Sequence, residues 1–185
     1  MKKIILSAIV AVCAISANAQ VWAGGKLGFN VTSGDLYPET ETQFTIAPEI
    51  GYTINDKLDV AVALDLSLIK NSLTLSELYG VPTNKDCNAT EFSVEPYARY
   101  TFAEAGIAKF FVDGYVGFGS YKPKGVDATT TWKFGVRPGV KVALSDDICL
   151  VSTLGNLGYK TVKDNYNKFG FNLDNAITFG IYFNF

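Results

Sequence analysis

Charged side chains recur at alternate positions inside otherwise apolar segments of this 185-residue chain. They are of both signs: Glu49, Asp65, Glu95, Arg99, Asp113, Arg137 and Lys141. Paired carboxylates can act as general acid and base, whereas carboxylates beside cations form buried ion pairs. Histidine is absent, which removes the commonest general base, metal ligand and catalytic-triad member. We therefore predict no catalytic residue, no metal site and no cofactor, and a protein that is not an enzyme.

The segments that carry these charges have a period of two, which is typical of β-strands with one apolar face. In Leu58–Leu68, leucine and valine take the even positions, and alanine, serine and aspartate stand between them. The same alternation predicts eight strands, near residues 21–32, 43–54, 58–68, 91–102, 108–121, 132–144, 148–160 and 176–185. Pro48, Pro96 and Pro138 fall inside these strands, and we expect β-bulges at those points.

The connections between the predicted strands alternate in length. Residues 55–57, 103–106 and 145–147 form short connections, and residues 34–41, 71–88, 122–128 and 161–168 form longer ones. Short turns on one side and long loops on the other are typical of bacterial outer-membrane barrels. The fold class predicted is all-β: an eight-stranded antiparallel up-and-down transmembrane β-barrel with short periplasmic turns and longer extracellular loops.

Alternation alone leaves open which face lines the barrel, because a soluble lipocalin-like barrel binds an apolar ligand with its apolar face inward. The polar face here is rich in glycine and alanine, which suits a crowded interior. Aromatic residues gather toward strand ends, as in membrane-interface girdles: Trp22, Tyr52, Tyr100, Tyr121, Trp132 and Tyr159. We expect the apolar rows to face lipid, and the secreted soluble carrier remains the alternative.

The interior of an eight-stranded barrel is just wide enough for side chains to fill, so the inward charges must meet. Counting back from the 103–106 turn predicts Tyr97 opposite Asp113, with Arg99 diagonal to Asp113. Across the next loop, Arg137 is expected near Asp113. The charges named above are therefore predicted to form a polar plug in the lumen. A structural plug is the main interpretation, and a gate that admits water or small ions is the alternative.

The first residues have the features of a secretory signal peptide. Lys2 and Lys3 supply a positive start, Ile4–Ile15 an apolar run, and Ala17-Asn18-Ala19 a cleavage site. The predicted domains are a signal peptide over residues 1–19 and a barrel over residues 20–185.

Two cysteines follow the predicted leader, and the predicted topology separates them. Cys87 falls in a long loop and Cys149 just after a short turn, on opposite sides of the membrane. Bridged cysteines need Cα atoms within about 7 Å, so no disulfide is expected inside one chain. A disulfide between two chains through Cys87 stays open.

The carboxyl-terminal run Ile181-Tyr182-Phe183-Asn184-Phe185 resembles the signal by which outer-membrane barrels are recognised for insertion. Ile181, Phe183 and Phe185 would carry that signal. The segments Ala47–Tyr52, Val94–Tyr100 and Val136–Val140 are similar to those of small outer membrane protein beta-barrel domains of the porin family, related in architecture to the OmpA and OmpX barrels. The resemblance covers essentially the whole chain after the leader.

This resemblance implies a monomer in the outer membrane of a Gram-negative bacterium. Its partners would be outer-membrane lipid, the barrel-assembly machinery during insertion, and an extracellular ligand or surface partner bound through the loops. The formal net charge of −2 and the lack of a basic tail argue against nucleic acid. The expected role is structural or surface interaction, with a polar, largely plugged lumen. A narrow pore for ions or very small solutes is the alternative.

Overall fold

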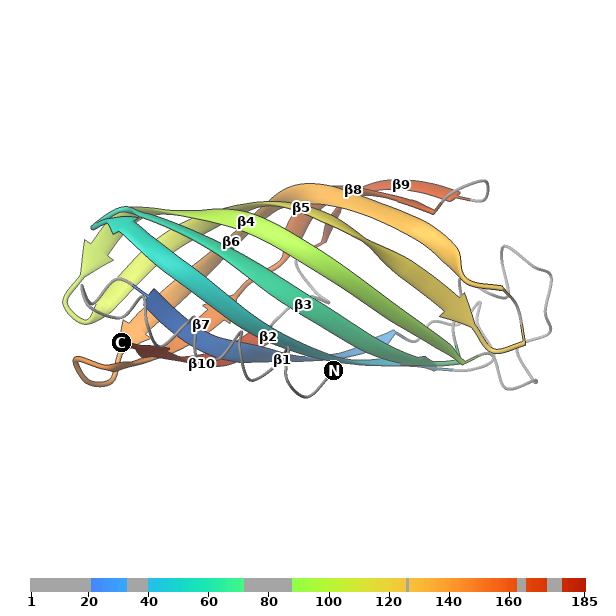
Figure 1. Cartoon of the computed structure of the whole chain (residues 1–185), viewed down its shortest axis with the longest axis horizontal. Helices are drawn as coiled ribbons and strands as arrows, with labels where there is room; N and C mark the ends of the chain where they lie inside the picture. The colour runs from blue at the N-terminus through green and yellow to red at the C-terminus, as the bar shows by residue number, and fades with distance from the viewer. Residues whose placement is uncertain (1–20, 33–39, 72–87, 126, 163–165, 173–177) are drawn as a thin grey trace, which may run out of the picture.

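The computed structural model describes residues 21–32, 40–71, 88–125, 127–162, 166–172 and 178–185, with side chains placed except in residues 32, 162 and 166–172. Ten strands lie in these parts (Figure 1): β1 (Val21–Thr32), β2 (Glu41–Asn55), β3 (Leu58–Lys70), β4 (Ala89–Ala105), β5 (Ala108–Pro123), β6 (Thr129–Ala143), β7 (Ile148–Thr153), β8 (Asn156–Val162), β9 (Tyr166–Asn172) and β10 (Thr178–Asn184). In the same parts of the chain, no helix is long and apolar enough to cross a membrane. The predicted leader lies outside the described residues.

These strands form one antiparallel sheet that closes into an eight-stranded barrel (Figure 1). From β1 to β6, each strand pairs with the next along the chain. β7 and β8 follow one another along the seventh barrel strand and both pair with β6. β9 and β10 make up the eighth and pair with β8 and β7. β10 also pairs with β1, which closes the barrel and confirms the predicted architecture.

A β-bulge separates β7 from β8. Arg137 and Pro138 of β6 lie opposite three residues, 154–156, because Gly139 pairs with Thr153 and Val136 pairs with Leu157. Gly155 has a φ of +73°, a conformation that glycine adopts without steric cost. The extra residue bends the seventh strand halfway along its length.

The proline residues do not create bulges in their own strands. The register of β2 with β3 is the same on both sides of Pro48, and that of β4 with β5 is the same on both sides of Pro96. The prediction of bulges is wrong at these two points, and beside Pro138 the bulge lies in the partner strand. One proline removes only one ladder hydrogen bond, so the flanking pairs can hold the register.

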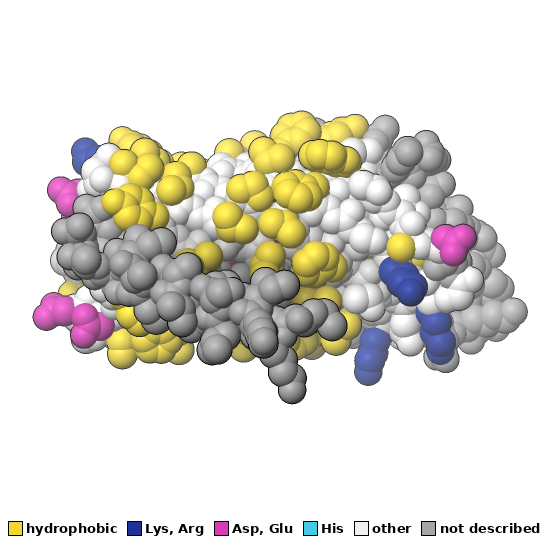
Figure 2. All heavy atoms as spheres, viewed as in Figure 1, with side chains coloured by type: hydrophobic (Ala, Val, Ile, Leu, Met, Phe, Trp, Pro, Cys, Tyr) yellow, Lys and Arg dark blue, Asp and Glu magenta, His cyan; other side chains and the backbone are white. Residues whose placement is uncertain are grey.

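Apolar side chains cover the outer wall of the barrel. Leu64, Leu66 and Leu68 expose 44%, 41% and 49% of their surface, whereas Ala63 is 1% exposed. Figure 2 shows hydrophobic side chains spread over the middle of the wall. This orientation matches a lipid-facing barrel and overturns the soluble-carrier alternative, which required these rows to point inward.

The predicted aromatic girdle is only partly correct. Three of its members are exposed on the outer wall: Tyr52, Tyr100 and Trp132. Tyr159 packs against the outward Phe134, with ring centroids 5.3 Å apart. Trp22 and Tyr121 are buried, at 1% and 4% exposure, so the prediction that they belong to the girdle is wrong. Both occupy inward alternate positions, and nearness to a strand end does not decide the face.

Cys149 is a free, buried cysteine near the start of β7, where it pairs with Ala143 of β6 and Tyr182 of β10. Cys87 lies outside the described residues. The predictions about disulfides therefore stay predictions.

Candidate functional site

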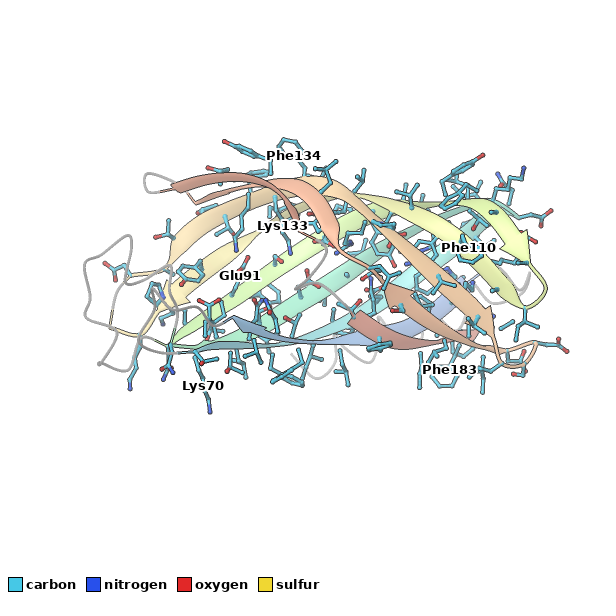
Figure 3. All side chains as sticks on the ribbon, turned by 180° about the vertical axis from the view of Figure 1, so that it is seen from behind. Lys70, Glu91, Phe110, Lys133, Phe134 and Phe183 are labelled. Carbon is cyan, nitrogen blue, oxygen red and sulfur yellow. The ribbon has the colours of Figure 1, made fainter. Side chains whose placement is uncertain are left out.

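Inward alternate positions bring charged side chains from distant parts of the chain into the lumen. Figure 3 shows Glu91 and Lys133 directed into the barrel and Phe134 directed away from it. On β4, Glu91, Glu95 and Arg99 recur at every fourth residue. This one strand therefore presents charges at three levels along the barrel axis.

The level nearest the turns holds a bidentate ion pair between Arg99 and Asp113. Arg99 Nε donates to Asp113 Oδ1 at 2.7 Å and Nη2 donates to Oδ2 at 2.9 Å. The two residues are direct cross-strand partners, so the predicted pairing of Tyr97 with Asp113 is wrong. The turn is formed by Gly106 and Ile107, and it lies further along the chain than the centre of residues 103–106, so the register differs from the predicted one. A β-bulge between Thr101 and Ala103 then shifts the register once more.

Aromatic rings enclose the Arg99 guanidinium. Its central carbon lies 3.8 Å from the centroid of the Phe111 ring. Three more rings have their centroids 5.5 to 5.9 Å away: Trp22, Tyr97 and Tyr182. Trp22 and Tyr182 stack at 4.5 Å, and Gly51 leaves the space for the Trp22 indole because a Cβ there would overlap it. Cations attract aromatic faces most strongly where water is excluded, as it is here.

Glu49 is the centre of the second cluster. Its Oε1 lies 2.7 Å from Lys26 Nζ, with side-chain exposures of 0% and 5%. Its Oε2 accepts hydrogen bonds from the hydroxyls of Tyr97, at 2.5 Å, and Tyr182, at 2.6 Å. The carboxylate therefore has one cation and two neutral donors, which together offset its removal from water.

Glu95 joins two cations in the middle of the lumen. Arg137 Nη2 contacts Glu95 Oε1, and Lys133 Nζ lies 3.0 Å from Glu95 Oε2. Lys133 also donates to Asp65 Oδ2 at 2.8 Å, which links β6 to β3 across the barrel. Arg137 is the register partner of Asp113, so the expected nearness of these two residues is confirmed.

The loop-side half of the lumen contains a polar cavity of about 380 Å³, here called the vestibule. Lys133 and Arg137 belong to its lining, together with Lys160, whose Nζ lies 2.6 Å from Glu91 Oε2. Neutral hydrogen-bonding groups line it as well: Gln43, Thr45, Ser67, Thr153, Asn156 and Thr178. The vestibule can hold water or a small polar molecule next to the central charges.

The chemistry of the lumen is that of paired charges. Among the residues that the structure describes, no group of three or more side chains is arranged to hold a metal ion. A buried ion pair is weakly stabilising as a unit, but removing one partner leaves an uncompensated charge and costs about 3–5 kcal/mol. Such pairs hold a particular arrangement of strands in place.

A family model for the outer membrane protein beta-barrel domain matches residues 4–185. The chain belongs to this family. Membership supports a location in the outer membrane, with lipid around the apolar wall. No curated protein sequence matches the chain.

Several solved structures align with most of the chain. Neisserial surface protein A aligns with a TM-score of 0.55 at 20% identity, over 89% of this chain and 97% of that one. Ail of Yersinia pestis gives a TM-score of 0.48 at 12% identity, over 90% and 99%. The N-terminal barrel of Pseudomonas aeruginosa OprF gives 0.47 at 13% identity, over 90% and 98%. At 20% identity, the comparison with the Neisserial protein shows the architecture of this chain.

Six of the seven charges predicted for the lumen meet oppositely charged partners there, and Lys141 does not. Within the described residues Lys141 forms no ion pair, and its cross-strand partner is Lys109. Lys109 lies 3.1 Å from Glu104 near the β4–β5 turn. Lys141 therefore belongs to the turn-side mouth of the barrel, where water can solvate an ammonium group, and not to the plug.

Several residues of these clusters were not predicted from the sequence. They are Lys26, Glu91, Lys133 and Lys160 among the charges, and Trp22, Phe111 and Tyr182 among the aromatics. Inward alternation could have identified Lys133, which shares the inward face of β6 with Arg137. The glycine-rich stretch around Lys26 weakens that signal in β1.

The predicted insertion residues lie together on the outer wall. Ile181, Phe183 and Phe185 expose 47%, 46% and 55% of their surface. β10 pairs with β1 on one side and β7 on the other, so the end of the chain completes the barrel.

Proposed function

We propose that this protein is a structural or surface-interaction barrel of the outer membrane, with a lumen closed in its turn-side half. One observation carries the proposal: Trp22, Arg99, Asp113 and Tyr182 fill the lumen with exposures of 1%, 1%, 0% and 0%. An eight-stranded barrel needs only such side chains to fill its width. Contact with partners is then left to the loops.

A non-enzymatic role agrees with the environment of the carboxylates. Asp113 is held by a bidentate arginine, and Glu95 is held by Arg137 and Lys133. Glu49 is saturated by Lys26 and two tyrosine hydroxyls. A general base needs a reachable proton and a free lone pair near its substrate, and these groups already have their partners.

Conductance across planar bilayers tests the plug. We expect the wild-type barrel to give no stable single-channel current. The double variant W22A/Y182A removes the stacked rings from the lumen and should conduct. The matched variant F134A/F179A removes two aromatic side chains from the outer wall and should stay silent. Steady current through the wild-type barrel would contradict a closed lumen, and mobility on unheated gels shows whether each variant has folded.

The runner-up is a narrow pore for ions or very small solutes, and the vestibule favours it. In a pore, Arg137 at the inner part of the vestibule would act as the gate, since its guanidinium lies against Glu95. R137A would then change the current of a conducting wild-type barrel. Unchanged conductance in R137A disposes of the gate.

The route to the membrane is part of the same proposal. Residues 1–19 act as a leader removed on export, and the protein acts as a monomer. Ile181, Phe183 and Phe185 engage the barrel-assembly machinery, and their outward exposure supports this role. The mass of the mature protein should correspond to a chain that begins at Gln20. F185S should lower the yield of folded barrel in cells while refolding in detergent is unaffected. Equal yields of F185S and wild type would contradict the insertion signal.

A further inference from the structure

The outer wall changes its chemistry at the loop-side edge of β3, β4 and β5. The apolar rows of these strands end at Leu68, Phe92 and Phe118, which expose 49%, 47% and 44% of their surface. The next outward positions are polar: Lys70 on β3, Thr90 on β4, and Ser120 and Lys122 on β5. Figure 3 shows Lys70 pointing away from the barrel at this end.

Strand pairing places Lys70 and Lys122 on either side of β4. Thr90 pairs with Leu68 of β3 and with Lys122 of β5, and Lys70 is the next outward residue after Leu68. Two strand spacings and two residues of rise put their Cα atoms about 12 Å apart. Two flexible four-carbon side chains can therefore bring both ammonium groups to one anionic group between them.

The surroundings of this pair, as far as the structure describes them, leave its charge available to an outside ligand. Both lysines are exposed, and within the described residues neither forms an ion pair. Lys124 is exposed in the turn that follows β5 at the same edge, and its backbone N–H donates to Asn88 O at 2.8 Å. Among the described residues, the exposed carboxylate that lies nearest to Lys124 in the sequence is that of Asp127.

The two edges of the apolar wall differ in charge. The turn side carries four exposed acidic residues, Asp56, Glu104, Asp146 and Asp147, against two lysines, Lys57 and the Lys109 that pairs with Glu104. In Figure 2, most Asp and Glu side chains lie at the left end and most Lys and Arg side chains at the right, beyond the hydrophobic zone. A molecule that touches both the apolar rows and the lysines must be apolar at one end and anionic at the other.

We propose that Lys70 and Lys122 form a binding site for the phosphate group of an outer-leaflet lipid, whose acyl chains lie along Leu68, Phe92 and Phe118. The position of the lysines at the end of the apolar rows favours a lipid over a free anion. A lysine near an anionic membrane surface contributes about fivefold to binding. This site is independent of the lumen and of whether the lumen conducts.

Quenching of tryptophan fluorescence by brominated lipid tests the site. Trp132 is exposed on the neighbouring strand, with its ring centroid 5.8 Å from that of Phe118, so it reports lipid bound there. The full barrel is placed in dioleoylphosphatidylcholine vesicles with increasing fractions of brominated phosphatidic acid or brominated phosphatidylcholine. We expect wild type to prefer phosphatidic acid, and K70Q/K122Q to lose that preference by roughly fivefold per lysine.

The matched control is K57Q/K109Q, which removes two lysines from the turn-side edge and should keep the wild-type preference. High salt should weaken the preference, because exposed charges are screened. Equal affinity of wild type for the two lipids, or an unchanged preference in K70Q/K122Q, would overturn the proposal. Displacement of phosphatidic acid by equimolar inorganic phosphate would also overturn it, because the site would then bind a free anion. Gel mobility before and after heating verifies that both variants are folded.

Discussion

The two halves of the lumen solve the same problem, buried charge, in different ways. In the turn-side half, Arg99 and Asp113 are 1% and 0% exposed and lie among aromatic rings. In the loop-side half, Lys160 is 36% exposed beside Glu91 and borders the vestibule. Desolvated charges need exact partners, whereas charges next to water tolerate imperfect ones. The turn-side half should therefore carry most of the energetic specificity of the barrel.

The largest expected effect comes from breaking the turn-side pair. D113N keeps the shape of the side chain but leaves Arg99 without its anion, and should lower the free energy of unfolding by about 3–5 kcal/mol. The matched variant D65N should cost only about 1 kcal/mol, because Lys133 keeps Glu95 and the pair is partly exposed. Urea titration of the barrel in lipid vesicles measures both values. Equal losses in D113N and D65N would remove the distinction between the two halves.

A smaller effect is expected at Glu49. Y182F removes one of two tyrosine hydroxyls that donate to Glu49 Oε2, while Tyr97 and Lys26 remain. The expected loss is about 1.5–3 kcal/mol, the usual range for a hydrogen bond to a charged group. The same urea titration measures it, with Y100F on the outer wall as the control. A loss as large as that of D113N would mean that the Tyr182–Glu49 hydrogen bond is as important to this half as the Arg99–Asp113 ion pair.

The smallest effect is expected at the vestibule. K160Q removes a partly exposed cation from Glu91 and should change the free energy of unfolding by less than about 1 kcal/mol. Raising the salt concentration should reduce the difference between K160Q and wild type further, whereas the D113N difference should persist. A loss above 3 kcal/mol in K160Q would show that the vestibule is as dry as the plug.

Sequence patterns predicted the strands and most of their faces correctly. They failed where the prediction depended on the pairing register of two strands or on how close a residue lies to the end of the barrel. Alternation placed Glu49, Glu95 and Arg137 inside the barrel as the structure has them. It did not place Asp113 opposite Arg99, because the length of the turn and the bulge before it are not visible in a period of two. Lys141 shows the same limit, since its inward parity does not reveal that it lies level with the turn-side mouth.

Period two is a local property of an extended chain, so the sequence by itself determined which residues share a face and that the apolar face must be covered by something other than water. Partners inside the lumen were decided only by closure of the barrel. Tyr182 donates to Glu49 from 133 residues away, and Lys133 reaches Asp65 across 68 residues. Such contacts depend on strand register, bulges and the curvature of the wall together, because side chains of strands that do not pair meet only after the sheet has closed.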